Sequence, residues 1–178
     1  MWDRILPVVL IVAVFFAAGV FLFMFMWKSV PSEFPDPDQL KVLGTIPANW
    51  SVTSLDGKEV SAGDLRGKVL FINRWATWCP PCMAEMPSIQ ALYTSLVGAN
   101  VAFLLISEEK PSKVQQMATK EGWTMPIYLA TEGFPPVLET QRIPATFIAD
   151  RKGRVVYRMV GGKDWNTDDA RGFLQKIP

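Results

Sequence analysis

The chain has 178 residues, with 18 basic and 17 acidic side chains that give a formal net charge of +1. The charges are mixed along the chain without blocks of one sign, so the composition does not indicate nucleic acid or a strongly anionic partner. The absence of histidine excludes His-dependent general bases, Cys–His proteases and His-ligated metal sites. The 2 cysteines form a single Cys-x-x-Cys, which leaves none for a separate disulfide framework.

The first element is an apolar segment. No charged residue occurs from Ile5 to Trp27, a stretch long enough as a helix to cross the about 30 Å of a bilayer core. Trp2 and Trp27 stand at its ends, where aromatic rings favour the membrane interface. A cleaved signal peptide, cut near 17–19, is the alternative, but such a peptide becomes polar after its cleavage site and this run stays apolar. We therefore expect residues 1–28 to form an uncleaved transmembrane anchor.

The segment after the apolar run differs in composition. Residues 29–45 contain several prolines with acids between them and are expected to form an extended linker. The remainder, 46–178, has the length of one domain. One basic residue flanks the apolar run on each side, Arg4 before it and Lys28 after it, so the positive-inside rule gives little indication of the orientation. Because short N-terminal anchors usually carry their domain across, we expect a single-pass protein of the inner (cytoplasmic) membrane, with its domain on the extracytoplasmic, periplasmic side.

The domain alternates patterns typical of strands and helices. Continuous apolar runs at 69–72 and 101–106 indicate buried strands, whereas Pro111 and Gly122 bracket a predicted helix. The succession ends in a hairpin and a helix, which predicts an α/β fold with a mixed central sheet flanked by helices. In chain order we expect strands at 50–55, 58–61, 69–72, 101–106, 126–129, 146–148 and 155–160, and helices at 79–96, 111–121, 135–140 and 168–177.

The two cysteines lie where the strand at 69–72 leads into a predicted helix. At a helix N-terminus, backbone N–H groups and the positive end of the dipole stabilise a thiolate, the form that attacks disulfides. Cys79 has this position, and Cys82 lies one turn later, where it can resolve a mixed disulfide or close an internal one. Pro81 fits the first helical turn, and Pro80 removes a possible N–H donor near Cys79. The spacing predicts a redox-active disulfide.

Two other interpretations of the Cys-x-x-Cys are weaker. A passive staple across so short a loop stabilises a fold little. A metal site needs further ligands, and the chain has no histidine and no other cysteine to supply soft ones. We therefore expect thiol–disulfide exchange with no cofactor and no bound metal.

The run from Asp64 to Pro87, which includes Trp75-Ala76-Thr77-Trp78-Cys79-Pro80-Pro81-Cys82, resembles the active-site signature of the TlpA/ResA group. The resemblance extends from about Trp50 to the C-terminus. Members of this group are membrane-anchored, thioredoxin-like reductases of the extracytoplasmic space. The resemblance implies a thioredoxin-like fold with an N-terminal β-hairpin and a strand–helix insert, which residues 125–140 match.

The resemblance also implies roles for single residues. It implies a cis proline facing the cysteines, and Pro144, which follows Ile143, is the matching site. Glu85 lies three residues after Cys82 and on the same helix face, so it is either a helix-end charge or an acid near the buried thiols. The group places an acid at this position of the motif, which favours the second interpretation, with Glu85 accepting a proton from Cys82. Trp78 is expected to be an exposed partner-binding surface beside Cys79.

Four polar residues near the motif are harder to interpret. Asn73 stands where many thioredoxins carry a buried acid. Arg74 departs from the group, which usually has an aromatic residue there; it is either a strand-edge charge reaching water or a cation near the active-site thiol. Glu108 and Glu109 follow a strand, and a solvated loop is the expected place for both.

These observations lead to three hypotheses of function. The first is a reductase of protein disulfides, as in cytochrome c maturation or the preparation of metal-site cysteines, that takes electrons from a membrane thiol donor. The second is an oxidant or isomerase of the same fold, and the third is a non-enzymatic binding or metal-delivery module. The expected partners are proteins that bear disulfides or thiols. We also expect the N-terminal helix to hold the protein in the membrane, and we expect no nucleic-acid partner. The expected catalytic residues are Cys79, Cys82, Glu85 and Pro144, and the expected substrate-binding residues are Trp78, Ile143 and Pro144.

Overall fold

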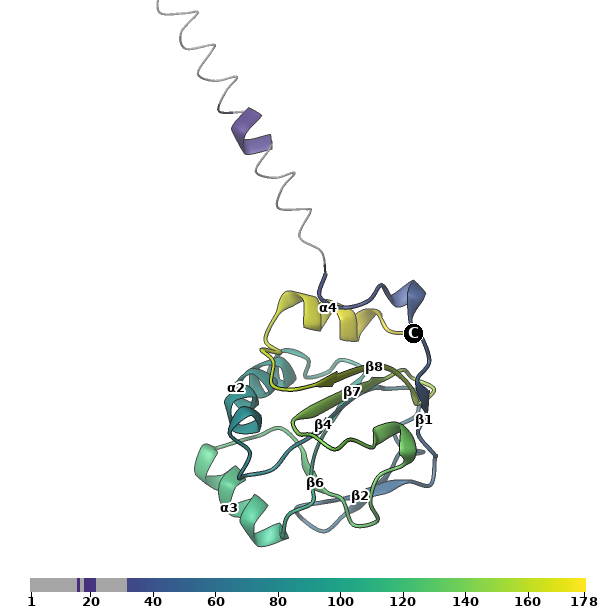
Figure 1. The fold of residues 1–178 in the computed structure, drawn as a ribbon, viewed down its shortest axis with the longest axis vertical. Coiled ribbons are helices and arrows are strands. Elements are labelled where there is room, and N and C mark those ends of the chain that lie inside the picture. Colours follow the sequence, from purple (N-terminus) through teal and green to yellow (C-terminus); the bar gives the residue numbers. More distant parts are fainter. Residues whose placement is uncertain (1–15, 17, 22–31) are drawn as a thin grey trace, which may run out of the picture. The chain divides into compact units, whose positions relative to one another are not determined.

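The computed structural model describes residues 16, 18–21 and 32–178 and divides into two compact units, 1–33 and 34–178. In the first unit, residues 16 and 18–21 are helical and exposed. The second unit contains the sheet and all the elements discussed below (Figure 1).

The predicted single-pass location in the inner membrane is contradicted. Crossing a bilayer takes about 20 consecutive, mainly apolar helical residues, and no helix among the described residues is long and apolar enough. Most of the predicted span Ile5–Trp27, and of the predicted anchor 1–28, lies outside the described residues. The membrane location, and the periplasmic placement that depended on it, are therefore not retained.

Within the described residues, eight strands form one mixed sheet in the order β1-β8-β7-β4-β5-β6-β2-β3. The central strand β4 pairs parallel with β5 and antiparallel with β7, as the predicted α/β class requires. The hairpin of β2 and β3 joins the sheet through β6. The strands are β1 (Gly44–Thr45), β2 (Ser51–Ser54), β3 (Glu59–Ser61), β4 (Val69–Arg74), β5 (Val101–Ser107), β6 (Ile127–Leu129), β7 (Ala145–Ala149) and β8 (Arg154–Val160).

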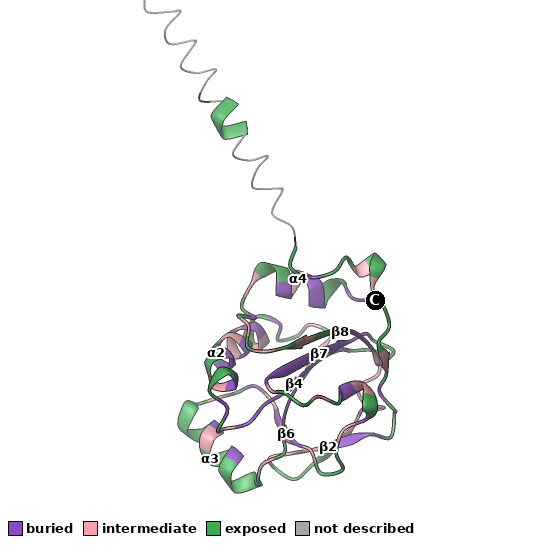
Figure 2. Ribbon diagram, in the orientation of Figure 1, coloured by how far each residue is buried: buried purple, intermediate pink, exposed green. Residues whose placement is uncertain are grey.

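Three helices cover one face of this sheet: α2 (Pro80–Ser95), α3 (Pro111–Glu121) and α4 (Asp168–Lys176). Their buried side chains share one apolar cluster with Phe71 of β4, whereas the alternate residue Ile72 belongs to a second cluster. This alternation follows from the two-residue period of a strand. Because both faces of β4 are covered, all six of its residues are buried (Figure 2). The strand therefore reads as a continuous apolar run that ends in two polar residues.

The opposite face is covered without a long helix. The second cluster contains Ile46, Trp50 and Val52 from the N-terminal part of the unit, together with Leu138. Leu138 belongs to a short 3-10 helix, η3 (Pro136–Leu138), in the predicted insert. The insert thus consists of strand β6 and this 3-10 turn, and the turn passes over the face opposite α2.

Part of the segment expected to be an extended linker contributes to the folded unit. Phe34 is buried and stacks on Phe173 of α4, with 4.8 Å between ring centroids. Strand β1 pairs with β8 at one edge of the sheet. A second 3-10 helix, η2 (Pro37–Gln39), lies between them. The proline-rich composition did not indicate these contacts, because they depend on a partner more than 100 residues away.

Candidate active site

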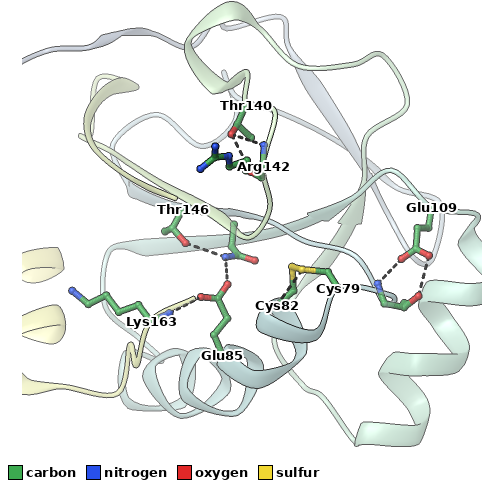
Figure 3. Close-up of a disulfide and its surroundings, with 10 residues drawn as sticks. Cys79, Cys82, Glu85, Glu109, Thr140, Arg142, Thr146 and Lys163 are labelled. Carbon is green, nitrogen blue, oxygen red and sulfur yellow. Dashed lines mark hydrogen bonds between the residues drawn. A yellow bond between two sulfur atoms is a disulfide. The ribbon is translucent and has the colours of Figure 1, made fainter. Parts of the chain in front are cut away.

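The disulfide lies at the N-terminal end of α2 (Figure 3). Cys79 is the N-cap residue with an extended backbone, and Pro80 and Pro81 occupy the first two helical positions. The two cysteines are joined, with their Cα atoms 5.2 Å apart. The backbone N–H of Cys82 donates to Sγ of Cys79 at 3.3 Å. One unpaired N–H of the helix end is thus aimed at the sulfur of Cys79, where it favours a negative charge.

Glu85 lies in the interior beside the disulfide and not at the helix surface (Figure 3). Only 3 % of its surface is exposed, and its carboxylate accepts three hydrogen bonds. Nδ2 of Asn73 donates to Oε1 at 2.8 Å, and the backbone N–H of Lys163 and Nε1 of Trp165 donate to Oε2 at 3.2 and 3.3 Å. Because no guanidinium or ammonium group is among these donors, Glu85 is held as a buried acid and not as half of an ion pair.

Burial raises the pKa of Glu85 above its ordinary value, and the three hydrogen bonds offset this rise only in part. A carboxyl group with a raised pKa exchanges its proton closer to neutral pH than an exposed glutamate does. The arrangement therefore provides a proton acceptor next to the buried sulfur of Cys82. The helix-end interpretation of Glu85 does not describe this environment.

Asn73 joins Glu85 to the central sheet. It is fully buried near the end of β4, and its Nδ2 donates both to Glu85 and to Oγ1 of Thr146, the latter at 3.0 Å. Thr146 belongs to β7 and pairs with Asn73 in the sheet register. The roles of Thr146, Lys163 and Trp165 were not predicted, because these residues lie 61 to 80 positions from Glu85 in the sequence and only the sheet brings them to it.

Two glycines after β8 contact both the loop that contains Pro144 and the first turn of α2. The Ile143–Pro144 peptide bond is cis, as the resemblance implied. The carbonyl of Pro144 accepts a hydrogen bond of 2.8 Å from the N–H of Gly161. A Cβ atom at Gly162 would lie 3.1 Å from the carbonyl oxygen of Pro81, tighter than most real contacts. The absence of a side chain at Gly162 thus lets the segment after β8 approach the first turn of α2.

The two tryptophans before Cys79 have different environments, and Trp78 is exposed as predicted. Trp75 is buried against Trp123, whereas 66 % of the surface of Trp78 is exposed. An exposed aromatic ring directly before the reactive cysteine offers an apolar surface to a protein partner.

Glu109 was expected in a solvated loop, and this expectation is wrong. Its carboxylate accepts hydrogen bonds from the backbone N–H of Thr77 at 2.6 Å and from the Thr77 hydroxyl at 2.9 Å, and it forms an ion pair with Lys113 (Figure 3). Burial alone would raise the pKa of Glu109, but the bonds from Lys113 and Thr77 outweigh it and lower that pKa. Glu109 therefore fixes the loop that leads into Cys79.

The interpretation of Arg74 as a strand-edge charge reaching water is also wrong. Its strand is central in the sheet, so the side chain is buried. The guanidinium pairs with Glu108 at 3.0 Å, donates to the carbonyl of Leu138 at 3.0 Å, and lies 3.6 Å from the ring centroid of Phe134. Arg74 thus links β4 and the loop after β5 to the insert. Its partner Glu108 lies in a solvated loop, as predicted, with 61% of its side chain exposed.

The described residues contain no group of three or more His, Cys, Asp or Glu side chains that could hold a metal ion.

Comparisons with known proteins agree with this site. A model of the Redoxin family matches residues 41–174. ResA, a thiol-disulfide oxidoreductase, is 30% identical to the chain over 152 residues in Bacillus anthracis, covering 81% of this chain and 83% of that protein. ResA of Geobacillus thermodenitrificans is 32% identical over 139 residues, covering 76% and 78%.

Solved structures give the same result. A thiol:disulfide interchange protein of the thioredoxin family from Chlorobium tepidum TLS is 26% identical, with a TM-score of 0.62, and the match covers 75% of this chain and 94% of that one. StoA from Bacillus subtilis, at 23% identity and a TM-score of 0.55, shows the fold alone. The predicted thioredoxin-like fold and the predicted oxidoreductase activity are thus confirmed. The chain belongs to the Redoxin family, and within it to the thioredoxin-like thiol–disulfide oxidoreductases of the TlpA/ResA type.

Proposed function

We propose that the protein works as a reductase of protein disulfides, with Cys79 as the attacking thiol and Cys82 as the resolving thiol. The observation that carries the proposal is the asymmetry of the pair. Both cysteines are buried, but Cys79 is the N-cap and receives an N–H from Cys82, whereas Cys82 lies inside the helix on the face that also carries Glu85. The first environment favours a thiolate, and the second supplies a place for a proton.

The reaction then proceeds in two exchanges. The thiolate of Cys79 attacks one sulfur of the client disulfide, forming a mixed disulfide and releasing the other client sulfur as a thiolate, which takes up a proton from water. The thiolate of Cys82 next attacks Sγ of Cys79, closing the internal disulfide and releasing the second client thiol. The client gains two electrons and two protons, and the protein loses them. A dithiol protein returns the protein to its reduced state by the same exchange.

Glu85 serves the second exchange. Cys82 is buried, so its thiol has to lose its proton to a nearby group before it can attack. Glu85 is likewise buried, and the raised pKa of its carboxyl lets it accept that proton and pass it on. The client itself would rest on Trp78 and beside the Ile143–Pro144 loop. The described strand ladders end at Ala145, so the backbone of Ile143 lies outside them and can pair with an extended client segment.

The charges around the pair support the reducing direction. A strong oxidant stabilises its reduced, thiolate form. Here Glu85, when ionised, disfavours nearby thiolates, and Pro80 supplies no N–H to Cys79. Both features favour the disulfide and make the dithiol the better electron donor. Client proteins such as cytochrome c precursors or proteins with metal-site cysteines would present the disulfides.

Two measurements test the proposal. The reduction potential, measured by equilibration with glutathione, is expected to be closer to the about −270 mV of thioredoxin than to the about −120 mV of a strong oxidant. A value at the oxidising end would favour the oxidant or isomerase instead. In the second measurement, Cys82→Ser should accumulate mixed disulfides on Cys79. Accumulation on Cys82 in the Cys79→Ser variant would show that the assignment of the two thiols is reversed.

A further inference from the structure

An open groove lies beside the proline loop, on the side of the sheet opposite α2. Its walls come from the segment that precedes Ile143 and from the end of β8. The residues that line it are Glu139, Thr140, Gln141, Arg142, Arg158 and Val160. None of these residues belongs to the disulfide or to the network around Glu85.

The groove adjoins the place where a client would bind. Val160 pairs with Ala145, the residue after Pro144, and Arg158 lies two residues earlier on the same face of β8. The residue after Val160, Gly161, donates to the carbonyl of Pro144. Arg142 immediately precedes Ile143 at the other wall, and Figure 3 shows it on the loop above the two cysteines. A client segment that pairs with Ile143 and extends past it would run between these walls.

The backbone at Arg142 is held in place. The hydroxyl of Thr140 accepts a hydrogen bond of 3.3 Å from the N–H of Arg142 and donates one of 3.0 Å to its carbonyl. Arg142 and Arg158 are both exposed, and Val160 at the end of β8 is 41 % exposed. The groove thus combines an exposed apolar residue with two cationic side chains.

The positive charge of the groove is not compensated. In the described part of the chain, Arg142 and Arg158 have no ion-pair partner, and Arg158 lies only against the ring of Phe147, 5.5 Å from its centroid. Glu139 also lines the groove, but it pairs with the buried guanidinium of Arg74 at 3.5 Å. Counting Arg74 and its second partner Glu108, three guanidinium groups face two carboxylates. One net positive charge remains at a site open to solvent.

We propose that this groove, on the basis of the reductase function above, selects client segments that carry an acidic residue close to the reactive cysteine. A carboxylate in the groove takes hydrogen bonds from Arg142 and Arg158, which supply charge-assisted donors. An aspartate within a few residues of the client cysteine can reach the groove, since an extended chain advances about 3.3 Å per residue. A client lysine at the same place is repelled by the positive charges of Arg142 and Arg158.

The test uses three model peptides that differ at one position near an intramolecular disulfide: aspartate, serine or lysine. The specificity constant kcat/KM for their reduction is measured with the full chain at low and at high salt. We expect the order aspartate, serine, lysine, with about three- to ten-fold between the extremes, which is the size of two partly exposed ion pairs. The differences should shrink at high salt.

Two variants locate the effect. Arg142→Gln combined with Arg158→Gln removes two of the three guanidinium groups and leaves both carboxylates, so the aspartate peptide should lose its advantage over the lysine peptide. The matched control is Arg151→Gln with Lys152→Gln, which removes the same charge from the exposed turn at the opposite end of the β7–β8 hairpin. The control should keep the order of the three peptides.

Equal rates for the three peptides with the unmodified protein would overturn the proposal. So would a control variant that removes the order as fully as the groove variant, because only the total charge would then matter. The rates are also measured in reverse, as oxidation of the dithiol peptides by the disulfide form. If only the reverse reaction runs, the reductase function fails, but the charge order in that direction still decides the role of the groove.

Discussion

Two carboxylates flank the disulfide, and their surroundings shift their pKa values in opposite directions. Glu85 lies behind Cys82 and receives only neutral donors, so burial prevails and its pKa is raised. Glu109 contacts the loop that leads into Cys79. It pairs with Lys113 and accepts two hydrogen bonds from Thr77, and these interactions outweigh the effect of burial and lower its pKa. The comparison teaches that burial changes the chemistry of an acid only where no counter-charge accompanies it. One carboxylate can therefore move a proton, and the other positions the loop.

The two carboxylates should differ most in their effect on the rate of mixed-disulfide resolution. Glu85→Gln should slow the resolution of the mixed disulfide by about 100-fold, the lower range for loss of a general base. The rate is measured by stopped flow as decay of the mixed disulfide. Glu109→Gln is the control, because a glutamine oxygen can still accept from Thr77, and it should change the rate by less than about two-fold. Equal losses in the two variants would mean that both acids act only through structure.

Asn73 should have the next largest effect, because it holds Glu85 in place. Asn73→Leu leaves a buried carboxylate with one donor fewer and should lower the free energy of unfolding by about 1–3 kcal/mol. The pKa of Glu85 should rise further, so the pH profile of resolution should move to higher pH. Thr146→Val keeps the bond from Asn73 to Glu85 and is the control. A stability loss in Asn73→Leu with an unmoved pH profile would reduce Asn73 to a packing role.

The two acids should also give opposite pH dependences of stability. A raised folded pKa means that the contribution of Glu85 is present below its unfolded pKa and is lost as pH rises through its folded pKa. Glu85→Gln should therefore gain stability relative to the unmodified protein from pH 4 to pH 8. The contribution of Glu109 is present above its unfolded pKa and is lost as pH falls through its folded pKa, so Glu109→Gln should lose stability over the same rise.

Denaturant unfolding of both variants across this pH range measures the two slopes. Slopes of the same sign would contradict the contrast between the two sites.

The smallest effect is expected at Lys113. Lys113→Ala removes the counter-charge but leaves both bonds from Thr77, so stability should fall by less than about 1 kcal/mol. The pKa of Glu109 should rise toward its ordinary value, as measured by NMR titration of its carboxyl carbon. An unchanged pKa would show that Thr77 alone lowers it. Lys120→Ala, which removes a lysine of the same helix that pairs with Glu121, serves as the control.

Local patterns predicted most of the elements correctly. The helix Pro111–Glu121 has the predicted limits, because a proline can begin a helix and Gly122 takes the left-handed backbone that ends it. The place of Cys79 at the start of α2 was predicted for a similar reason, since the signals lie within a few residues. Strand β1 and the packing of Phe34 were not predicted, because a two-residue strand and a single aromatic ring carry no periodicity.

The sequence by itself determined the redox pair, the helix that presents it, and the place of Glu85 on the same helix face, because all of these depend on spacing along one element. Only the tertiary structure decided what each acid and the arginine contact. Glu85 meets Trp165, Glu109 meets Thr77, and Arg74 meets Glu108 through strand pairings and crossings that join distant segments. A charged residue has no preferred environment of its own. The groups that the fold places around it set its burial, its partners and its pKa, and these decide its role.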